Sequence, residues 1–307
     1  MYSLSTCWNS GRHTDGRAML REIRDLGFEF AELSHGIRLS LLEGILAAVD
    51  AGEIRISTLH NFCPLPLGVN KPAPNLFQFS AEDRRERDSA WKHTLKTLET
   101  AARVRARLVV LHLGSLPMPG YTDRLKELVA RGERNSPKYD RLCAELLERR
   151  EAIKEAPFAR VVEMLGRVAA EASRLGLQLG VENREALEEL PLDDDFFLFF
   201  RQFTSPAIGY WHDTGHAQIK ENLGFLHHAM HLESLAPQLL GFHIHDVAFP
   251  AQDHHAPGAG TVDFAALKPF VRRDHIKVFE LHPATSAEDL RRGVAHIKSL
   301  WGEGAAE

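Results

Sequence analysis

Histidines and acidic residues of this chain recur at the ends of evenly spaced apolar runs. They are His60, His112, Glu182, Asp213, His216, His243, His245 and Glu280. Segments with a helical pattern separate the runs. In a parallel β/α barrel the carboxyl ends of all strands meet at one face, where such barrels carry out chemistry. Imidazole nitrogens and carboxylate oxygens that converge on one point form the ligand set that a divalent metal ion needs.

A regular alternation of strands and helices must position these residues. We predict strands over residues 2–7, 28–33, 55–60, 107–113, 178–183, 207–213, 239–246 and 276–281. We predict helices over residues 15–26, 38–51, 82–105, 157–175, 194–203, 221–235, 263–270 and 286–301. This alternation is what a closed barrel requires, so the predicted fold class is α/β, a single (β/α)8 TIM barrel. No internal repeat or linker is visible, which favours one domain over residues 1–307.

Two connections are longer than a barrel needs. The first follows His60 and contains prolines that prevent regular structure. The second is an extended insertion, residues 115–156, between the fourth strand and its helix, and it carries two charged helical patterns. Because both leave the C-terminal ends of strands, we predict that they cover the site as lids that exclude water. For the insertion, a surface hairpin or a contact between copies of the chain stays open as an alternative.

Composition limits the class of protein. The chain has 307 residues and a formal net charge of −5, which gives no general attraction to nucleic acid. No apolar stretch is long enough to span a bilayer, and the first residues lack the pattern of a signal peptide. Three cysteines cannot all pair and indicate a reducing compartment, so we expect a cytoplasmic protein.

The alternation of side chains along a strand tests which candidates can face the barrel interior. His243 and His245 share one parity, and Glu182 and Glu280 have parities that allow an inward position. A buried carboxylate without a partner is costly, so each glutamate needs a cation or an arginine. With Asp213 and His243 on neighbouring strands, a metal ion explains the set better than two salt bridges.

The most specific local motif is Asp213-Thr-Gly-His216. The aspartate ends a strand, and a tight turn returns a histidine to the same place three residues later. The alternative is an aspartate that caps a helix, followed by a histidine in its first turn. His212 has the opposite parity, so we expect it behind the site or against a helix.

Three further candidates have weaker support from position alone. His60, His112 and Glu32 each end a strand, and each can contact substrate or, for the histidines, bind a second metal ion. The alternative is a hydrogen-bonded residue at the rim or a structural ion pair. The Asp253–His255 stretch lies in the loop after the seventh strand, and we interpret it as exposed loop rather than as metal ligands.

Several catalytic classes lack their residues here. Lys277 has the parity opposite to Glu280, so no lysine faces inward at a strand end for Schiff-base chemistry. The chain has no G-x-S-x-G turn and no glycine-rich loop of the kind that binds nucleotide phosphates.

The motifs VEN, HDTGHA, HIHD, GAGTVDF and FELHP, in this order, resemble the xylose isomerase-like barrel superfamily. That group includes sugar isomerases, ketose epimerases, inosose dehydratase-type enzymes and the endonuclease IV type of DNA-repair nuclease. The resemblance implies four metal ligands, Glu182, Asp213, His243 and Glu280, with His243 chosen because HIHD matches H-[IV]-x-D. It implies that His216 contacts substrate, as in the epimerases, or metal, as in the nucleases.

The predicted function is that of an isomerase or epimerase that depends on one divalent metal ion (Mn, Mg, Co or Zn). Its substrate would be a sugar, sugar acid or cyclic polyol, and a related dehydratase is compatible with the same site. Glu182 and Glu280 would move a proton next to a carbonyl while the metal stabilises the enediolate. We expect substrate contacts from His216, His60, His112, His245 and Glu32.

Two other functions stay open. A nuclease-type phosphodiesterase acting on abasic DNA would need several metal ions, with extra ligands from His60, His112, His216 and residues 253–255. The acidic net charge and the VENREALEE continuation argue against it. The segment DVAFPAQD also lacks the arginine of tagatose- or psicose-type epimerases. A non-catalytic sugar-binding barrel would keep the pocket without the metal.

We expect a small carbohydrate as partner, neither membrane nor nucleic acid, and leave a homo-oligomer open.

Overall fold

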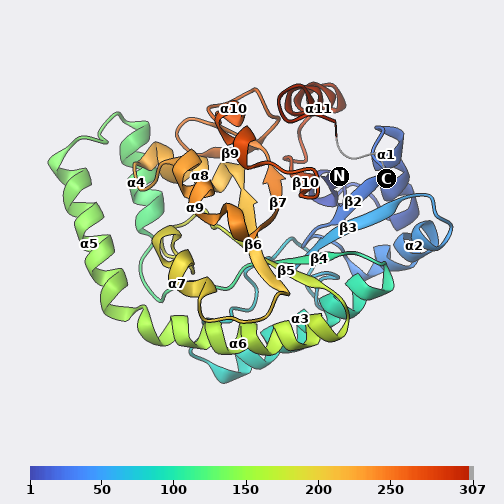
Figure 1. Cartoon of the computed structure of the whole chain (residues 1–307), viewed down its shortest axis with the longest axis horizontal. Helices are drawn as coiled ribbons and strands as arrows, with labels where there is room; N and C mark the ends of the chain where they lie inside the picture. The colour runs from blue at the N-terminus through green and yellow to red at the C-terminus, as the bar shows by residue number, and fades with distance from the viewer. Residues whose placement is uncertain (304–307) are drawn as a thin grey trace.

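Eight parallel strands close into a barrel in the computed structural model, which describes residues 1–303 (Figure 1). They are β1 (Tyr2–Ser5), β2 (Phe30–Leu33), β3 (Arg55–His60), β4 (Leu108–Leu111), β5 (Gln178–Glu182), β6 (Ile208–Asp213), β7 (Leu239–Ile244) and β10 (Ile276–Phe279). Around the barrel the order is β1-β10-β7-β6-β5-β4-β3-β2. The predicted TIM barrel is therefore confirmed, with each predicted strand in its place.

Amphipathic helices cover the outside of the barrel. They are α1 (Gly16–Asp25), α2 (Leu39–Asp50), α3 (Arg84–Arg103), α6 (Glu155–Arg174), α7 (Phe196–Phe200), α9 (His228–Leu235), α10 (Phe264–Leu267) and α11 (Ala287–Trp301). In α1, Asp15 caps the first turn and the buried Met19, Leu20 and Ile23 recur at helical spacing. The main apolar core therefore lies between strands and helices. A separate apolar cluster of strand residues, Leu108, Val110, Trp211, Ile276 and Val278, accompanies the polar residues of the strand ends inside the barrel.

Two predictions about local structure were wrong. The helix expected over residues 221–235 is two helices, α8 (Thr214–Leu223) and α9, separated at Gly224, whose φ of 86° suits glycine. Helix α8 begins directly after β6 because the side chain of Asp213 caps it. The loop expected after the seventh strand forms a hairpin of β8 (Asp246–Ala248) and β9 (Gln252–His255). The strand expected over residues 239–246 therefore ends earlier, at Ile244.

The insertion folds as two helices with a small core of their own. Helices α4 (Tyr121–Ala130) and α5 (Pro137–Ile153) lie at the left of Figure 1, with α5 outermost. Their apolar residues pack with Leu187, Ile219 and Leu223. The guanidinium of Arg150, which is fully buried, donates to the backbone carbonyls of Leu187 at 2.7 Å and Glu189 at 3.2 Å. The insertion is thus fastened to the loop that follows β5, and its role as a lid stays a prediction.

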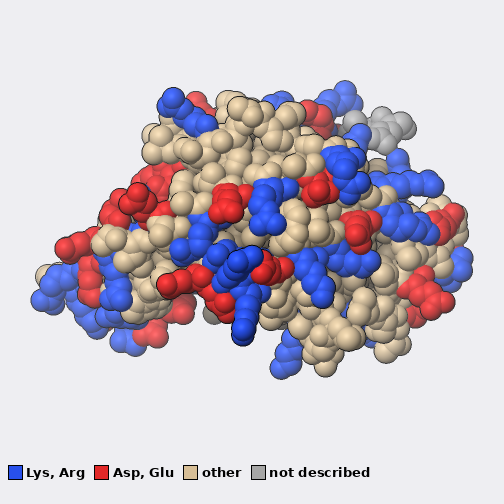
Figure 2. Space-filling model, turned by 90° about the horizontal axis from the view of Figure 1, so that it is seen from below, with Lys and Arg blue, Asp and Glu red and all other residues tan. Residues whose placement is uncertain are grey.

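Charged side chains of both signs are interspersed over the face shown in Figure 2. The interspersed signs leave no continuous field of one sign on that face. Exposed ion pairs also occur on the surface of the protein, such as Arg103 with Asp50 at 2.6 Å, and each adds little stability. Within residues 1–303, no helix is both long enough and apolar enough to cross a membrane.

A buried histidine at the start of β10 should make stability depend on pH. Burial, and then the charge of Arg272, lowers the pKa of His275 from 6.5 to about 4. Its Nδ1 accepts the backbone N–H of Arg272 at 3.2 Å, which requires the neutral ring. Between pH 6.5 and 4 the unfolded chain therefore binds a proton that the native protein does not, so the free energy of unfolding falls as the pH falls.

Between pH 7 and pH 4 we expect His275 to lower the free energy of unfolding by up to about 3 kcal/mol. This figure follows from the difference between its pKa of 6.5 in the unfolded chain and about 4 in the native protein. Urea unfolding over this range measures the loss. The variant His275→Asn keeps an acceptor near Nδ1 but does not titrate, so its pH dependence should be shallower than that of the natural chain. Equal slopes would contradict the assignment.

Candidate metal and catalytic site

Four side chains that the sequence singles out meet at the carboxyl ends of neighbouring strands. Glu182 ends β5, Asp213 ends β6, His243 lies near the end of β7, and Glu280 follows β10. One nitrogen or oxygen atom from each lies within 4.8 Å of those of the other three. All four are at most 4 % exposed. Parity and register bring them together, since Asp213 lies directly opposite His243 on the next strand.

The imidazole of His243 is the centre of this group. Its Nδ1 lies 2.6 Å from Glu182 Oε1, 3.1 Å from Glu280 Oε2 and 3.9 Å from Asp213 Oδ2. Burial alone would lower the pKa of His243, but the charges of Glu280, Glu32 and Glu182 raise it well above the usual value. Four carboxylates, those of Glu182, Glu280, Asp213 and Glu32, thus surround one imidazole, an excess of negative charge that a divalent cation would neutralise.

Asp213 has two roles in the structure. Its Oδ1 accepts the backbone N–H of His216 at 2.7 Å, so the helix cap that stood as an alternative is present. The same carboxylate belongs to the cluster with Glu182, His243 and Glu280 that could hold a metal ion, and its Oδ1 lies 2.9 Å from His245 Nε2. Burial lowers the pKa of His245, but Asp213 overrides it and raises the pKa to about 9. Cap and site residue are therefore one side chain here.

His216 is brought to the same place but is held as a neutral ring. Its Nδ1 lies 3.0 Å from the carbonyl of Asn183 and 3.6 Å from Asp213 Oδ2. Burial lowers its pKa to about 4, although Asp213 acts in the opposite direction. The carbonyl of Asn183 is nearer to Nδ1 than the donor Nη1 of Arg184, at 3.0 Å against 3.4 Å, which favours the proton on Nδ1 and leaves Nε2 as an acceptor.

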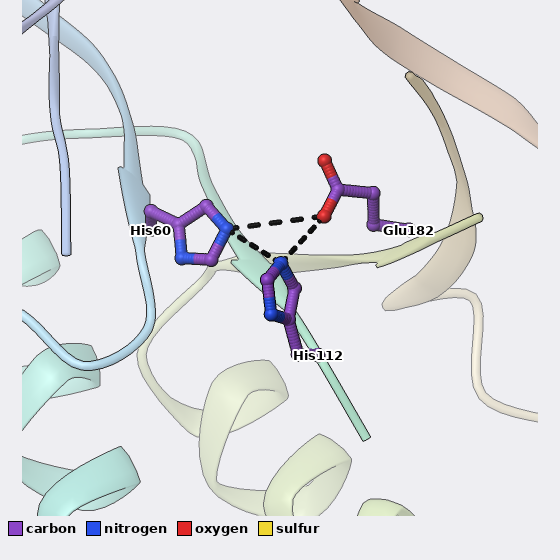
Figure 3. Close-up of side chains that lie close together, drawn as sticks. All are labelled: His60, His112 and Glu182. Atoms are coloured by element: carbon purple, nitrogen blue, oxygen red, sulfur yellow. Dashed lines mark hydrogen bonds and ion pairs between the residues drawn. The ribbon is translucent and has the colours of Figure 1, made fainter. Parts of the chain in front are cut away.

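A second group joins the first through Glu182 (Figure 3). His60 Nε2 and His112 Nε2 are 3.0 Å apart, and they lie 3.9 Å and 2.7 Å from Glu182 Oε2. The Nδ1 atoms face acceptors at 2.8 Å, the carbonyl of Asn61 for His60 and Asn75 Oδ1 for His112. With their protons on Nδ1, both Nε2 atoms present lone pairs beside a carboxylate, an arrangement that suits a cation.

The proline-rich loop after His60 reaches this second group. Asn75, within the loop, contacts His112 through Oδ1, and its Nδ2 lies 3.4 Å from Glu189 Oε1. The sequence offered no signal for Asn75, because it lies in irregular chain. These contacts close the site on one side, and the role of the loop as a lid stays a prediction.

Arg184 is a site residue that sequence reasoning missed. Its Nη1 donates to Glu182 Oε2 at 2.6 Å and its Nε to Glu189 Oε1 at 3.1 Å. Burial raises the pKa of Glu182, but the charges of Arg184 and His243 outweigh burial and hold the pKa well below the usual value. Arg184 lies two residues after Glu182, just past the end of β5, and this position was the signal that the sequence offered.

The hairpin after β7 also approaches the site, although we interpreted it as exposed loop. The ring of His254 stacks on His245 at 4.3 Å, and its Nε2 lies 4.0 Å from Glu280 Oε2. Asp253 lies with Glu185 and His216 in a group whose ligand atoms are within 4.8 Å of one another, close enough to hold a metal ion. Beside the hairpin is a cavity of about 640 Å³. The loop interpretation was therefore wrong for Asp253 and His254, because the hairpin folds them back over the barrel.

Two other candidates lie away from the centre of the cluster. Glu32 is fully buried and contacts His243 from the side opposite to the carboxylate cluster. His212, expected behind the site, points outward, with Nδ1 2.9 Å from Tyr210 Oη and Nε2 2.9 Å from His228 Nε2. The opposite parity of His212 and Asp213 accounts for this separation.

Comparison with known proteins identifies the fold family. A family model described as Xylose isomerase-like TIM barrel matches residues 20–300. A D-tagatose 3-epimerase-like protein has a similar structure, with TM-score 0.70, 15 % identity, and coverage of 97 % of this chain and 96 % of that one. The 3-keto-D-glucoside 4-epimerase of E. coli has TM-score 0.68, 17 % identity, and coverage of 97 % and 98 %. Comparison with curated proteins finds no match.

The IolI protein with a bound zinc atom is a third similar structure, with TM-score 0.64, 14 % identity, and coverage of 97 % and 98 %. At these identities the likeness shows a shared fold and leaves the reaction to be argued from the site. The family model covers most of the chain and agrees with the closed barrel and its polar strand ends. This chain belongs to the Xylose isomerase-like TIM barrel family.

Proposed function

We propose that this protein is a divalent-metal-dependent isomerase or epimerase acting on a sugar, a sugar acid or a cyclic polyol. The observation that carries the proposal is the buried cluster of Glu182, Asp213, His243 and Glu280, with one ligand atom from each within 4.8 Å of the others. Similar solved structures include sugar epimerases and a zinc-bound barrel, which supports the same class of reaction.

The residues of the cluster fit one divalent ion. Three carboxylates and one imidazole supply mixed oxygen and nitrogen ligands, which suit Mn²⁺, Mg²⁺, Co²⁺ or Zn²⁺. Such an ion, when bound, polarises a substrate carbonyl and stabilises negative charge that develops on its oxygen.

The protein groups supply the proton transfer. Glu182 and Glu280 approach His243 Nδ1 from two strands that β6 and β7 separate, so a substrate held there lies between two carboxylates. Arg184 and His243 keep Glu182 ionised, the form that a general base needs. His216, neutral and with Nε2 free to accept, can orient a substrate hydroxyl.

Burial of the site supports chemistry that must exclude water. Glu182, Asp213 and His243 are each at most 1 % exposed, and Asn75 of the proline-rich loop closes over His112. A carbanion-like species next to a carbonyl survives longer where solvent protons are excluded. Substrate entry then requires movement of a covering loop, which is the lid function that we assign to residues 61–80 and to the insertion.

One observation favours a second candidate, a multi-metal phosphodiesterase of the endonuclease IV type acting on abasic DNA. The groups His60–His112–Glu182 and Glu185–His216–Asp253 could each hold a further ion. Two or three ions within a few ångströms can clamp the oxygens of a phosphodiester. The mixed charges on the face shown in Figure 2 do not add to this case, since nucleic acid requires clustered basic residues.

Counting metal ions per chain separates the candidates. The protein, purified without chelator and saturated in turn with Mn²⁺, Co²⁺ and Zn²⁺, is expected to bind one ion with high affinity in elemental analysis after desalting. Two or three tightly bound ions, with cleavage of abasic-site DNA, would favour the phosphodiesterase. A chain that binds sugar but no metal would favour a non-catalytic barrel.

A further inference from the structure

Glu32 is a buried carboxylate whose place in the barrel points to a specific task. It lies on β2 and is 0 % exposed. Its Oε2 lies 3.0 Å from His243 Nε2 and accepts the hydroxyl of Thr58 at 2.8 Å. Among residues 1–303 its other oxygen, Oε1, has no hydrogen-bond partner. Among the described residues, Glu32 belongs to none of the groups that could hold a metal ion. Its contact with the cluster of Glu182, Asp213, His243 and Glu280 is made through His243.

Such a carboxylate is poorly compensated as a structural element. A buried charge costs several kcal/mol unless hydrogen bonds replace those it made to water. In Glu32 only Oε2 has such partners, the Thr58 hydroxyl and the His243 imidazole. An apolar residue in the same place would fill the barrel at lower cost. The energetic balance therefore favours a role for Glu32 that depends on its acceptor oxygen.

The two ring nitrogens of His243 face opposite surroundings. Nδ1 faces Glu182 and Glu280, at 2.6 Å and 3.1 Å, whereas Nε2 faces Glu32. A neutral imidazole carries one proton, and the partner of one nitrogen decides whether the other nitrogen presents a lone pair. An acceptor at Nε2 keeps the proton there and leaves Nδ1 as the ligand atom.

We propose that Glu32 is a positioning residue that sets the tautomer and the ring orientation of His243 for metal binding. The inference rests on the proposed metal site. Neighbouring rings restrict the same imidazole, since His60 stacks on it at 5.9 Å and Trp211 packs edge-on at 5.1 Å. These contacts limit the tilt of the ring but do not distinguish its two nitrogens, which only a polar partner can do. This role differs from the substrate contact that position alone suggested for Glu32.

Zinc titration of the metal-free chain tests the proposal. Glu32→Ala is expected to bind Zn²⁺ about 10- to 100-fold more weakly, the usual loss when the partner of a ligating histidine is removed. Glu32→Gln is expected to lie between Ala and the natural chain, because the amide oxygen can accept the same N–H. Nitrogen-15 spectra of the zinc-loaded natural chain should show the proton of His243 on Nε2.

Glu188→Gln is the matched control. Glu188 is also buried, but its carboxylate binds the first turn of α4, at Thr122, and not His243. It should keep the natural zinc affinity. Natural affinity in both Glu32 variants would overturn the inference. A His243 proton on Nδ1 in the zinc-loaded natural chain would overturn it as well, and this measurement does not depend on whether Glu32→Ala folds. A natural chain that binds no Zn²⁺ would instead overturn the proposed metal site itself, and the role of Glu32 with it.

Discussion

Replacement of Glu280 by glutamine is expected to slow exchange of the substrate's carbon-bound hydrogen with solvent deuterium by about 100-fold or more, the usual loss when a general base is removed. Glutamine keeps the shape of the side chain and an oxygen atom but cannot accept the proton. Three ligands, Glu182, Asp213 and His243, remain, so the variant should retain part of its metal. Nuclear magnetic resonance of a panel of ketoses, sugar acids and inososes in deuterium oxide measures the exchange.

The control for this variant is Glu163→Gln, an exposed position on α6 far from the strand ends. Its exchange rate should equal that of the natural chain. Undiminished exchange in Glu280→Gln would remove Glu280 from the reaction. No exchange of any substrate by the natural chain, together with cleavage of abasic-site DNA, would transfer the assignment to the phosphodiesterase.

Asp213→Ala is expected to remove most of the bound metal while the barrel stays folded. Loss of a ligand should cost more affinity than the roughly 10- to 100-fold that follows loss of a ligand's partner. The same substitution removes the cap of α8, because Asp213 Oδ1 accepts the backbone N–H of His216. We therefore expect a loss of about 1 kcal/mol of unfolding free energy from the cap alone.

The variant Asp213→Asn separates these two effects. Asparagine caps helices as well as aspartate does, so unfolding stability should recover while metal affinity stays low, because the ligand has lost its charge. Elemental analysis and urea unfolding of both variants give the two readouts. Natural metal content in Asp213→Ala would show that the ligand assignment is wrong.

The barrel could be predicted because its signals are local. Apolar runs alternate with amphipathic helices, and each alternation constrains the chain over a few residues only. Parity along single strands placed Glu182 and His243 inward and His212 outward. These rules hold wherever a strand has one face toward the core, so they did not require knowledge of long-range contacts.

The two wrong predictions of local structure have different causes, a local helix cap for α8 and contacts from a later loop for the hairpin. Helix α8 starts at Thr214 because a buried aspartate caps it, and its first residues are apolar or polar without clear periodicity. The hairpin β8–β9 forms from the segment DVAFPAQDHH, which precedes a loop with Pro257, Gly258 and Gly260 and was predicted as part of that loop. It is fixed by Asp246, whose carboxylate accepts the backbone N–H groups of Gly258, Gly260 and Val262.

The sequence by itself determined the fold class, the strands and the positions of Glu182, Asp213 and Glu280 at strand ends, since all of these follow from periodicity and strand position. The choice of His243 over His245 came from the resemblance of HIHD to the family motif, because the two histidines share one parity. Only the tertiary structure decided which residues complete the site. Arg184, Asn75 and His254 reach it from three separate loops. Glu32 meets His243 across the barrel, 211 positions apart in the chain. Contacts between such distant residues depend on how loops close and how strands are registered, which no short stretch of sequence encodes.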